Sequence, residues 1–195
     1  LIAITGTNGK TSIATMLFQL FTKLGYVCSL LSTVENKIGD QIIPSTHTTP
    51  HAIAINALLA KMADAGCTYC FMEASSHAIH QTRMFGLDID GAVFTNLTHD
   101  HLDFHGTFEN YLKAKCKLFE MIKEDGYCVI NADDPVYEQV KNACNGQVVT
   151  YGIQNNATYR ADDIQLGIEG TTFNLIYDEK SYPVRTNLVA LYNIY

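Results

Sequence analysis

The sequence predicts an α/β fold, in which a mostly parallel, doubly wound sheet carries a small antiparallel β appendage near the C-terminus. Up to about residue 152, short apolar runs alternate with segments whose apolar residues recur at helical spacing, which is typical of strand–helix–strand units in a parallel sheet. After about residue 152 the pattern changes: apolar and polar residues alternate at 164–168 and again at 173–177, which predicts antiparallel strands with one wet face. We therefore expect residues 1–152 to form the α/β core, and residues 153–195 to form an antiparallel subdomain that returns to the core.

The predicted strands of the core are short and apolar. Residues 1–5 form a continuous apolar run, as expected of a strand that is buried on both faces. Because the carboxyl ends of parallel strands meet at one edge of a sheet, ligand chemistry is expected there. Further strands are predicted at residues 26–33, 69–72, 92–95, 127–131, 148–151, 164–168 and 173–177.

Helices are predicted between these strands, and the residues at their ends mark where they start and stop. Thr49 predicts an N-cap, with Pro50 at the first helical position of the second helix. Thr107 predicts the N-cap of a helix over residues 108–123, and a further helix ends near residue 144. The first helix ends at Gly25, and its apolar face is predicted to hold Ile13, Met16, Leu17, Leu20, Phe21 and Leu24.

Composition excludes several classes of protein. Of the 195 residues 47% are hydrophobic and 17% are charged, which is enough for a folded core and excludes disorder. The net charge of −7 argues against a general nucleic-acid binder. No apolar run reaches the ~18 residues of a membrane helix, and no signal peptide is visible. The chain opens at Leu1 directly in a predicted core strand, so we expect it to be part of a longer protein.

The six cysteines are spread along the chain and include one CxxC pair, Cys67 and Cys70. A zinc site would normally use two such pairs, so this pair is not predicted to bind zinc. We expect the cysteines to be reduced, structural thiols of a cytoplasmic protein.

A candidate phosphate loop (P-loop) lies between the first strand and the first helix, in the stretch Gly6-Thr-Asn-Gly9-Lys10-Thr11. Glycines let backbone N–H groups point inward, and the N-terminus of the helix adds partial positive charge. Lys10 can reach the β- and γ-phosphates of a nucleotide, and the Thr11 hydroxyl can bind Mg²⁺. The common pattern has four residues between the glycines and this loop has two, but the strand before it and the helix after it favour phosphate binding.

A carboxylate ends another predicted strand. Glu73 closes the apolar run that starts at residue 69, and a polar stretch follows. A carboxylate at the carboxyl edge of a sheet can hold Mg²⁺ next to a phosphate loop. The alternative is a solvated strand terminus, and the nearby phosphate loop favours Glu73 as a metal ligand.

A histidine-rich loop follows the strand at residues 92–95. His99, His101 and Asp103 have the spacing of a metal-dependent hydrolase loop of HxHxDH type, but Phe104 follows where that pattern needs histidine, and His105 comes one residue late. The alternatives are contact with a metal or phosphate, and a polar loop that only caps neighbouring helices.

Lys115 interrupts the apolar stripe of the helix at residues 108–123, so its side chain is predicted to point along the buried face. A buried ammonium without a partner is costly and tends to lose its proton. Snorkelling to the edge of the helix is one alternative. The other is an anionic partner, or reaction of the neutral amine with CO₂ to give a carbamate that could bind Mg²⁺.

Taken together, these stretches resemble the Mur ligases of peptidoglycan synthesis. The stretch Ser75-Ser-His77, which follows Glu73, resembles the type that adds a diamino acid to a UDP-muramoyl-dipeptide. Folylpolyglutamate synthetases share the fold and the phosphate loop and are the alternative. The resembling motifs run in family order from residue 5 to residue 134: Thr5-Gly-Thr-Asn-Gly-Lys-Thr11, Thr48-Thr49, Met72-Glu-Ala-Ser-Ser-His77, Phe94-Thr-Asn-Leu-Thr-His-Asp-His-Leu-Asp-Phe-His-Gly106, Tyr111-Leu-Lys-Ala-Lys115 with Leu118-Phe119, and Asn131-Ala-Asp-Asp134.

The resemblance implies a role for each matching residue. One Mg²⁺ would be bound by Thr11 and Glu73, and a second by His101 and carbamylated Lys115. With Lys10, the residues Glu73, His101 and Lys115 would be catalytic. ATP would be bound by Gly6, Thr7, Asn8, Gly9, Lys10, Thr11 and Ser12, with Asn131 on the adenine side. The UDP-N-acetylmuramoyl-dipeptide would contact Thr48, Thr49, Ser75, Gln81 and Arg83.

The implied activity is ATP-dependent formation of an amide bond through an acyl phosphate, with lysine or diaminopimelate as the diamino acid. No nucleic-acid partner and no membrane insertion are expected. The family's N-terminal domain would precede Leu1, and its C-terminal domain would follow Tyr195, so we expect this fragment alone to be inactive as a ligase. A stretch near the end, residues 188–193, resembles the family's Gly-x-Phe-Asn element, with Ala190 and Tyr192 in place of Gly and Phe. A module that binds nucleotide without catalysis is the remaining alternative.

Overall fold

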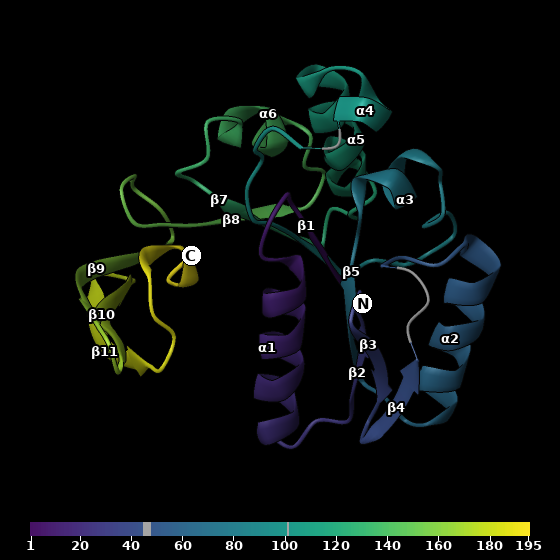
Figure 1. Ribbon diagram of the computed structural model, residues 1–195, viewed down its shortest axis with the longest axis horizontal. Helices are drawn as coiled ribbons and strands as arrows, with labels where there is room; N and C mark the ends of the chain where they lie inside the picture. Colours follow the sequence, from purple (N-terminus) through teal and green to yellow (C-terminus); the bar gives the residue numbers. More distant parts are fainter. Residues whose placement is uncertain (45–47, 101) are drawn as a thin grey trace.

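A computed structural model describes residues 1–44, 48–100 and 102–195 of the chain (Figure 1). Over these residues the strands form one eleven-stranded sheet in the order β11-β10-β9-β8-β7-β6-β1-β5-β2-β3-β4. The strands are β1 (Ile2–Thr5), β2 (Cys28–Leu31), β3 (Glu35–Ile38), β4 (Gln41–Pro44), β5 (Tyr69–Glu73), β6 (Gly91–Phe94), β7 (Tyr127–Asn131), β8 (Gln147–Gly152), β9 (Tyr159–Gly167), β10 (Gly170–Tyr177) and β11 (Lys180–Thr186). The helices are α1 (Lys10–Lys23), α2 (Ala52–Asp64), α3 (Ser76–His80), α4 (Leu102–His105), α5 (Phe108–Glu120), α6 (Tyr137–Asn142) and the 3₁₀ turn η1 (Leu191–Asn193).

The predicted α/β fold is confirmed by the pairing of the central strands. Strands β2, β5, β1, β6, β7 and β8 pair in parallel with their neighbours. The strand β1 lies between β5 and β6. Strands β2 to β5 lie on one side of it and strands β6 to β11 on the other, so β1 marks a switch point of the topology. The carboxyl ends of β1, β5, β6 and β7, at Thr5, Glu73, Phe94 and Asn131, therefore meet at one edge of the sheet.

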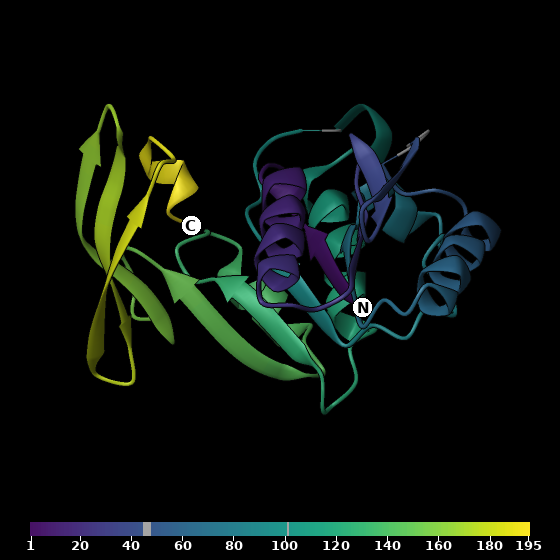
Figure 2. The same cartoon turned by 90° about the horizontal axis from the view of Figure 1, so that it is seen from below.

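Antiparallel strands flank this parallel centre at both edges. The strands β9, β10 and β11 form the predicted C-terminal appendage, and Figure 2 shows them at the far side of the molecule from α2. The hairpin of β3 and β4 extends the other edge and was not predicted. Its strands have only four residues each and contain polar residues, such as Glu35, Lys37 and Gln41, so they lack the apolar run that identified the central strands.

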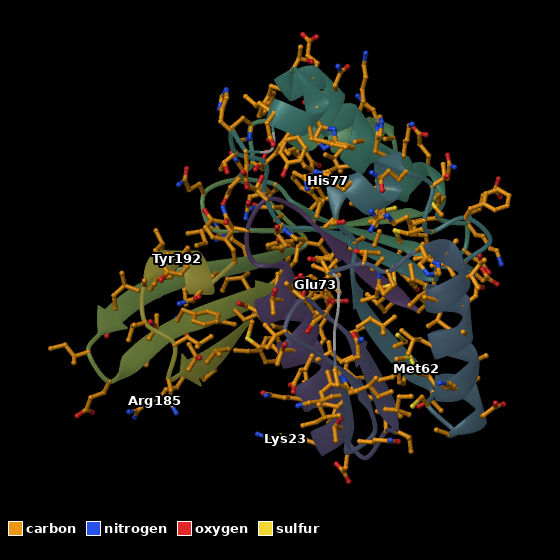
Figure 3. The ribbon with its side chains drawn as sticks, turned by 45° about the vertical axis from the view of Figure 1, so that its right-hand side comes forward. Lys23, Met62, Glu73, His77, Arg185 and Tyr192 are labelled. Carbon is orange, nitrogen blue, oxygen red and sulfur yellow. The ribbon has the colours of Figure 1, made fainter. Side chains whose placement is uncertain are left out.

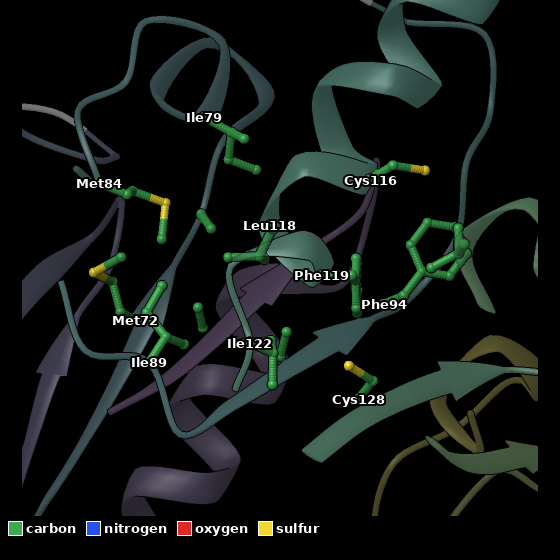
Figure 4. Packing of buried hydrophobic residues seen from close by; sticks show 14 of the residues in the cluster. Met72, Ile79, Met84, Ile89, Phe94, Cys116, Leu118, Phe119, Ile122 and Cys128 are labelled. Carbon is green, nitrogen blue, oxygen red and sulfur yellow. The ribbon is translucent and has the colours of Figure 1, made fainter. Parts of the chain in front are cut away.

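The two faces of the sheet are covered by different helices. On one face Ala14 and Phe18 of α1 pack against the strands. On the other face α2, α3, α5 and α6 cover a larger core, where Leu118 and Phe119 meet apolar side chains of the strands (Figure 4). Burial of each such large side chain stabilises the fold by roughly 1.5–3 kcal/mol. Packing of helices on both faces therefore stabilises the sheet whose carboxyl edge carries the site.

The apolar face predicted for the first helix is partly wrong. Met16, Leu20 and Leu24 are 42%, 52% and 64% exposed, whereas Ala14 and Phe18 are buried. The helix therefore faces the sheet with Ala14 and Phe18, with Ile13, Leu17 and Phe21 of the predicted stripe packed beside them. The spacing of the apolar residues identified the helix but not which of them face the sheet.

The start predicted for the second helix is also wrong. Helix α2 begins at Ala52 with His51 as N-cap, whose imidazole accepts the N–H of Ala54. The Thr49 hydroxyl donates instead to the main-chain oxygen of Glu73, at 2.9 Å. A contact to a distant strand has replaced the local capping bond, which local sequence cannot reveal. The helix predicted at 108–123 ends three residues earlier, at Glu120, and α3 and α4 were not predicted.

Within the described part of the chain no helix is both long and apolar enough to cross a membrane.

Candidate active site

The phosphate loop joins β1 to α1 and requires glycine at both of its ends. Gly9 has a φ of 89° and directly precedes the first residue of α1, and this left-handed conformation favours glycine. A Cβ atom on Gly6 would lie 1.8 Å from the Thr95 hydroxyl oxygen, so no larger residue fits there. No side chain caps α1, so the N–H groups of its first turn remain for an anion.

Two N–H groups of the loop are already occupied. Thr7 donates its N–H to the main-chain oxygen of Asn96 at 2.8 Å, and Asn8 donates to the Asn96 side-chain oxygen at 3.0 Å. The loop is thus bonded to the segment that leaves β6, and phosphate contacts fall to the residues from Gly9 onward. The sequence indicated a cradle but not this division of its donors.

Two lysine side chains converge on the loop. Lys10 donates to the main-chain oxygens of Gly6 at 3.0 Å and Thr7 at 2.8 Å. Lys115 donates to the same Gly6 oxygen at 2.8 Å. The two amines therefore share one carbonyl group, and a phosphate or carboxylate between them would be attracted by both.

Lys115 is buried, as its place in the helix predicted, with 1% of its surface exposed. Burial lowers its pKa well below the usual value, and the charge of Lys10 lowers it further. Its amine lies 4.5 Å from the centre of the Tyr111 ring, which gives a cation some compensation when the amine is protonated. Burial also lowers the pKa of Lys10, although Glu73 and Asp100 oppose that shift.

Glu73 ends β5 beside the loop and is 1% exposed. One carboxylate oxygen accepts the N–H of Thr33 at 2.7 Å, and the other lies 3.1 Å from the Thr33 hydroxyl. These bonds orient the carboxylate at the wall of a cavity of about 500 Å³. The cavity is lined by Gly6, Lys10, Thr11, Thr33, Thr48, Thr49, Glu73, Ser75, Ser76, His77, Arg83, Tyr111 and Lys115. Figure 3 labels Glu73 and His77 at this end of the sheet.

The residues assigned by resemblance to the muramoyl substrate are brought together at the same cavity. The Thr49 hydroxyl accepts the N–H of Ser75 at 3.2 Å. Arg83 donates to the Thr49 main-chain oxygen at 2.8 Å, and its Nε donates to the Gln81 side-chain oxygen at 2.9 Å. Thr48, Thr49, Ser75 and Arg83 line the cavity, while Gln81 stands behind Arg83 and orients its guanidinium group.

A second cavity, of about 480 Å³, lies on the other side of the phosphate loop and was not predicted. Asn131, expected near adenine, is not among its lining residues: the Asn131 amide donates to the Thr95 main-chain oxygen and accepts the N–H of Asp133. Asn131 pairs with Tyr151, which does line the cavity. The lining residues are Asn8, Gly9, Ser12, Ile13, Met16, Thr95, Asn96, Thr98, Tyr151, Tyr192, Asn193 and Tyr195. Four separate segments build this wall, and of its residues the sequence had singled out Asn8, Gly9 and Ser12 of the expected ATP-binding set and the stretch at residues 188–193.

The histidine-rich loop divides among several neighbours. His99 stacks on Phe108 at a ring distance of 5.0 Å, whereas His105 is buried and hydrogen-bonds to the Ser76 hydroxyl at 3.0 Å. His101 lies outside the described residues. Among the residues that are described, no three His, Cys, Asp or Glu side chains are grouped to hold a metal ion.

The chemistry of the side chains fits magnesium and a carbamate. The Thr11 hydroxyl and the Glu73 carboxylate border one cavity and are oxygen ligands of the kind that Mg²⁺ prefers. Lys115 offers the weakly basic amine that CO₂ needs.

The fold and this site define the class of the protein: an α/β domain in which a glycine-bordered loop and two converging lysines lie at the carboxyl edge of a mostly parallel sheet. The chain belongs to the Mur ligase family, because the family's middle domain matches residues 4–195.

Similar proteins agree with this assignment. A protein of Cytophaga hutchinsonii named UDP-N-acetylmuramoyl-L-alanyl-D-glutamate–2,6-diaminopimelate ligase is 44% identical over 98% of this chain and 40% of its own length. One of the same name from Bacillus licheniformis is 41% identical over 100% of this chain and 41% of its own. A solved structure of a ligase of that name has a TM-score of 0.90 at 35% identity, covering 99% of this chain and 40% of its own. The chain thus spans about two fifths of the length of these relatives.

Proposed function

We propose that this chain is the ATP-binding middle part of a ligase that joins a UDP-N-acetylmuramoyl-dipeptide to a diamino acid in peptidoglycan precursor synthesis. The observation that supports this most directly is the convergence of Lys10, Lys115 and Glu73 on one cavity beside the phosphate loop. The names of the similar proteins favour 2,6-diaminopimelate over lysine as the diamino acid. The proposal places the enzyme in the cytoplasm, where ATP is supplied.

In the first step, a carboxylate oxygen of the dipeptide attacks the γ-phosphorus of ATP. The bond between the γ-phosphorus and the bridging oxygen breaks, ADP leaves, and the dipeptide carboxylate becomes an acyl phosphate. Lys10 exchanges its bonds to Gly6 and Thr7 for phosphate oxygens and neutralises charge on them. The N–H groups at the start of α1 hold the same phosphates. Phosphoryl transfer needs mainly positioning and charge neutralisation, which these groups supply.

In the second step, the neutral amino group of the diamino acid attacks the acyl carbon of the acyl phosphate, the bond from that carbon to the phosphate oxygen breaks and phosphate leaves, and the nitrogen gives up one proton to solvent or to the phosphate to form the amide. No side-chain nucleophile takes part, so the cysteines need no catalytic role. Arg83, Ser75 and Thr49 line the same cavity as the lysines, and we assign them to hold the acceptor so that its carboxylate faces the γ-phosphate.

Following the family resemblance, we assign Thr11 and Glu73 to one Mg²⁺, and His101 with carbamylated Lys115 to a second. Bound magnesium would add charge neutralisation at the transferred phosphoryl group. Glu73 is the last residue of β5 and Lys115 lies on α5, so two different elements bring these assigned ligands to one cavity.

The second cavity is assigned to the nucleoside part of ATP. It adjoins Gly9 and Ser12 of the phosphate loop and carries the aromatic rings of Tyr151, Tyr192 and Tyr195. Aromatic rings stack on nucleobases regardless of sequence. A nucleotide would then cross the loop, with its base in one cavity and its γ-phosphate in the other.

The test is release of ADP by the protein that contains this chain at the length of its relatives. We expect ADP release to depend on both UDP-N-acetylmuramoyl-dipeptide and 2,6-diaminopimelate, with one amide formed for each ADP. ADP release that is independent of the dipeptide would identify an ATPase and contradict the ligase proposal. Stimulation by lysine alone would keep the ligase and correct the amino acid.

A further inference from the structure

The side-chain amide of Asn96, on the segment that leaves β6, bonds to both backbone groups of one residue in the phosphate loop. Its Oδ1 accepts the N–H of Asn8 at 3.0 Å, and its Nδ2 donates to the Asn8 carbonyl at 3.2 Å. Its own main-chain oxygen accepts the N–H of Thr7 at 2.8 Å. The paired bonds resemble those of a neighbouring strand, although this segment is a loop.

From this contact we infer that Asn96 is a positioning residue of the phosphate loop, which fixes the backbone at Asn8 and thereby the N–H groups that receive the nucleotide phosphates. The inference rests on the proposed nucleotide-binding function. It concerns a residue that the motif of the loop does not include.

The loop needs such an external support because of its own composition. Gly6 and Gly9 border it, and glycine allows many backbone conformations. Gly9 already has a left-handed φ of 89°, and rotation there would redirect the first turn of α1 relative to β1. Holding Asn8, the residue immediately before Gly9, removes most of that freedom before the nucleotide arrives.

The bonding pattern selects asparagine at position 96. The amide offers a donor and an acceptor on a short side chain, and both are needed for the N–H and the C=O of Asn8. Aspartate would keep the acceptor but would place a negative oxygen against the Asn8 carbonyl and near the phosphates. Alanine would remove both bonds. The Thr95 hydroxyl also donates to the Asn8 carbonyl, at 2.6 Å, so that carbonyl keeps one partner when Asn96 is changed.

The experiment compares Asn96→Ala and Asn96→Asp with Asn145→Ala. Asn145 makes the same type of bond, from its Nδ2 to the Glu120 main-chain oxygen, but lies just before β8, at the opposite edge of the sheet from the loop. Calorimetry of the full-length protein with Mg–ADP should show Kd weakened at least about tenfold in both Asn96 variants. Asn96→Ala loses two hydrogen bonds, whereas Asn96→Asp loses one and sets a negative oxygen against the Asn8 carbonyl. In Asn145→Ala the Kd should stay within about twofold of wild type.

Kinetics of the full-length protein separate positioning from a general loss of folded enzyme. We expect KM for ATP to rise about tenfold in Asn96→Ala, while KM for the muramoyl-dipeptide stays within about twofold. A variant that merely unfolds in part would lower kcat and leave both KM values unchanged, and that result overturns the inference, as does wild-type Mg–ADP affinity in either Asn96 variant. If the wild-type protein itself does not bind Mg–ADP, the proposed function fails instead.

Discussion

Within the part of the chain that the structure describes, the Lys10 ammonium hydrogen-bonds to its own loop, at the main-chain oxygens of Gly6 and Thr7. These contacts show that the side chain is long enough to fold over the place where phosphates would lie. We expect Lys10→Ala to weaken Mg–ATP binding by at least about a hundredfold, the loss of a charge-assisted phosphate contact in a partly buried site. Calorimetry measures this, with Lys23→Ala at the far end of α1 as control (Figure 3). Unchanged affinity in Lys10→Ala would remove the loop from the nucleotide site.

Substitutions of Lys115 should affect activity and stability differently. We expect Lys115→Met to keep the free energy of unfolding at neutral pH within about 1 kcal/mol of wild type or to raise it, because an apolar side chain of similar length avoids the cost of a buried charge. Ligase activity of the full-length protein should fall at least about a hundredfold. Lys115→Ala should also lose roughly 2–4 kcal/mol of stability through the cavity it leaves. Short-chain carboxylic acids should partly restore activity to Lys115→Ala by replacing the carbamate, and wild-type rates in either variant would exclude Lys115 from the site.

The lowered pKa of Lys115 also predicts how stability depends on pH. Between that lowered pKa and the ordinary value of 10.5, the unfolded chain binds more protons than the folded chain. Stability of the wild type should therefore rise with pH through this window, and the advantage of Lys115→Met should shrink as the pH approaches about 10. Urea unfolding of both proteins at pH values from about 7 to about 10 measures the difference. Parallel pH profiles would show that Lys115 stays protonated in the folded protein across this range, and so that its pKa is not lowered.

At the scale of elements, Asp133 joins the core to the appendage. Its carboxylate accepts the N–H groups of Ile153, Gln154 and Asn155 at 2.6, 2.9 and 2.7 Å, and the hydroxyl of Tyr195 at 3.1 Å. Partial burial by itself would raise the pKa of Asp133, but the three backbone bonds outweigh it and lower the pKa. The turn after β8 and the end of the chain thus depend on one ionised side chain.

We expect Asp133→Ala to lower the free energy of unfolding by about 1–2 kcal/mol, since three N–H groups lose their acceptor but remain near solvent. A carboxylate with a depressed pKa stabilises the fold above its unfolded pKa, and that contribution is lost as the pH falls through the folded pKa. The wild type should therefore lose stability below its ordinary carboxyl pKa of 3.8 more steeply than Asp133→Ala. Asp88→Ala serves as control, because Asp88 forms an exposed ion pair with Lys123, which is worth little. Equal acid sensitivity of Asp133→Ala and wild type would refute the role.

The sequence predicted elements wherever local periodicity decided the structure. The central strands are apolar runs, the buried position of Lys115 followed from helical spacing, and the glycines of the phosphate loop identified its place. It failed where a distant contact decided the outcome: Thr49 bonds to Glu73 instead of capping a helix. The second cavity combines residues from positions 8 to 195, and no local pattern records their meeting.

On the scale of the whole molecule, the sheet is continuous, but few residue pairs join the C-terminal appendage to the core. The pairing of β9 with β8 involves only two residue pairs, Tyr151 with Tyr159 and Gly152 with Arg160, whereas the strands of the appendage pair with one another over most of their length. The boundary after residue 152 stays a prediction. The hydrogen bonds of Asp133 to residues 153–155 and to Tyr195 add contacts at this short junction. Residues of the η1 turn also line the second cavity, next to residues of the core.

The chain holds a phosphate loop and both adjoining cavities, yet spans about two fifths of its relatives' length. We therefore expect residues 1–195 alone to bind Mg–ADP and to form no amide, because the phosphate contacts come from this chain while ligation needs both substrates enclosed and held in line. Calorimetry measures the first property. Mass spectrometry of a mixture with ATP, UDP-N-acetylmuramoyl-dipeptide and 2,6-diaminopimelate measures the second. Amide formation by the 195 residues at the rate of the full-length protein would show that this domain already contains all that catalysis requires, and absence of Mg–ADP binding would show that the loop depends on the remaining sequence for its conformation.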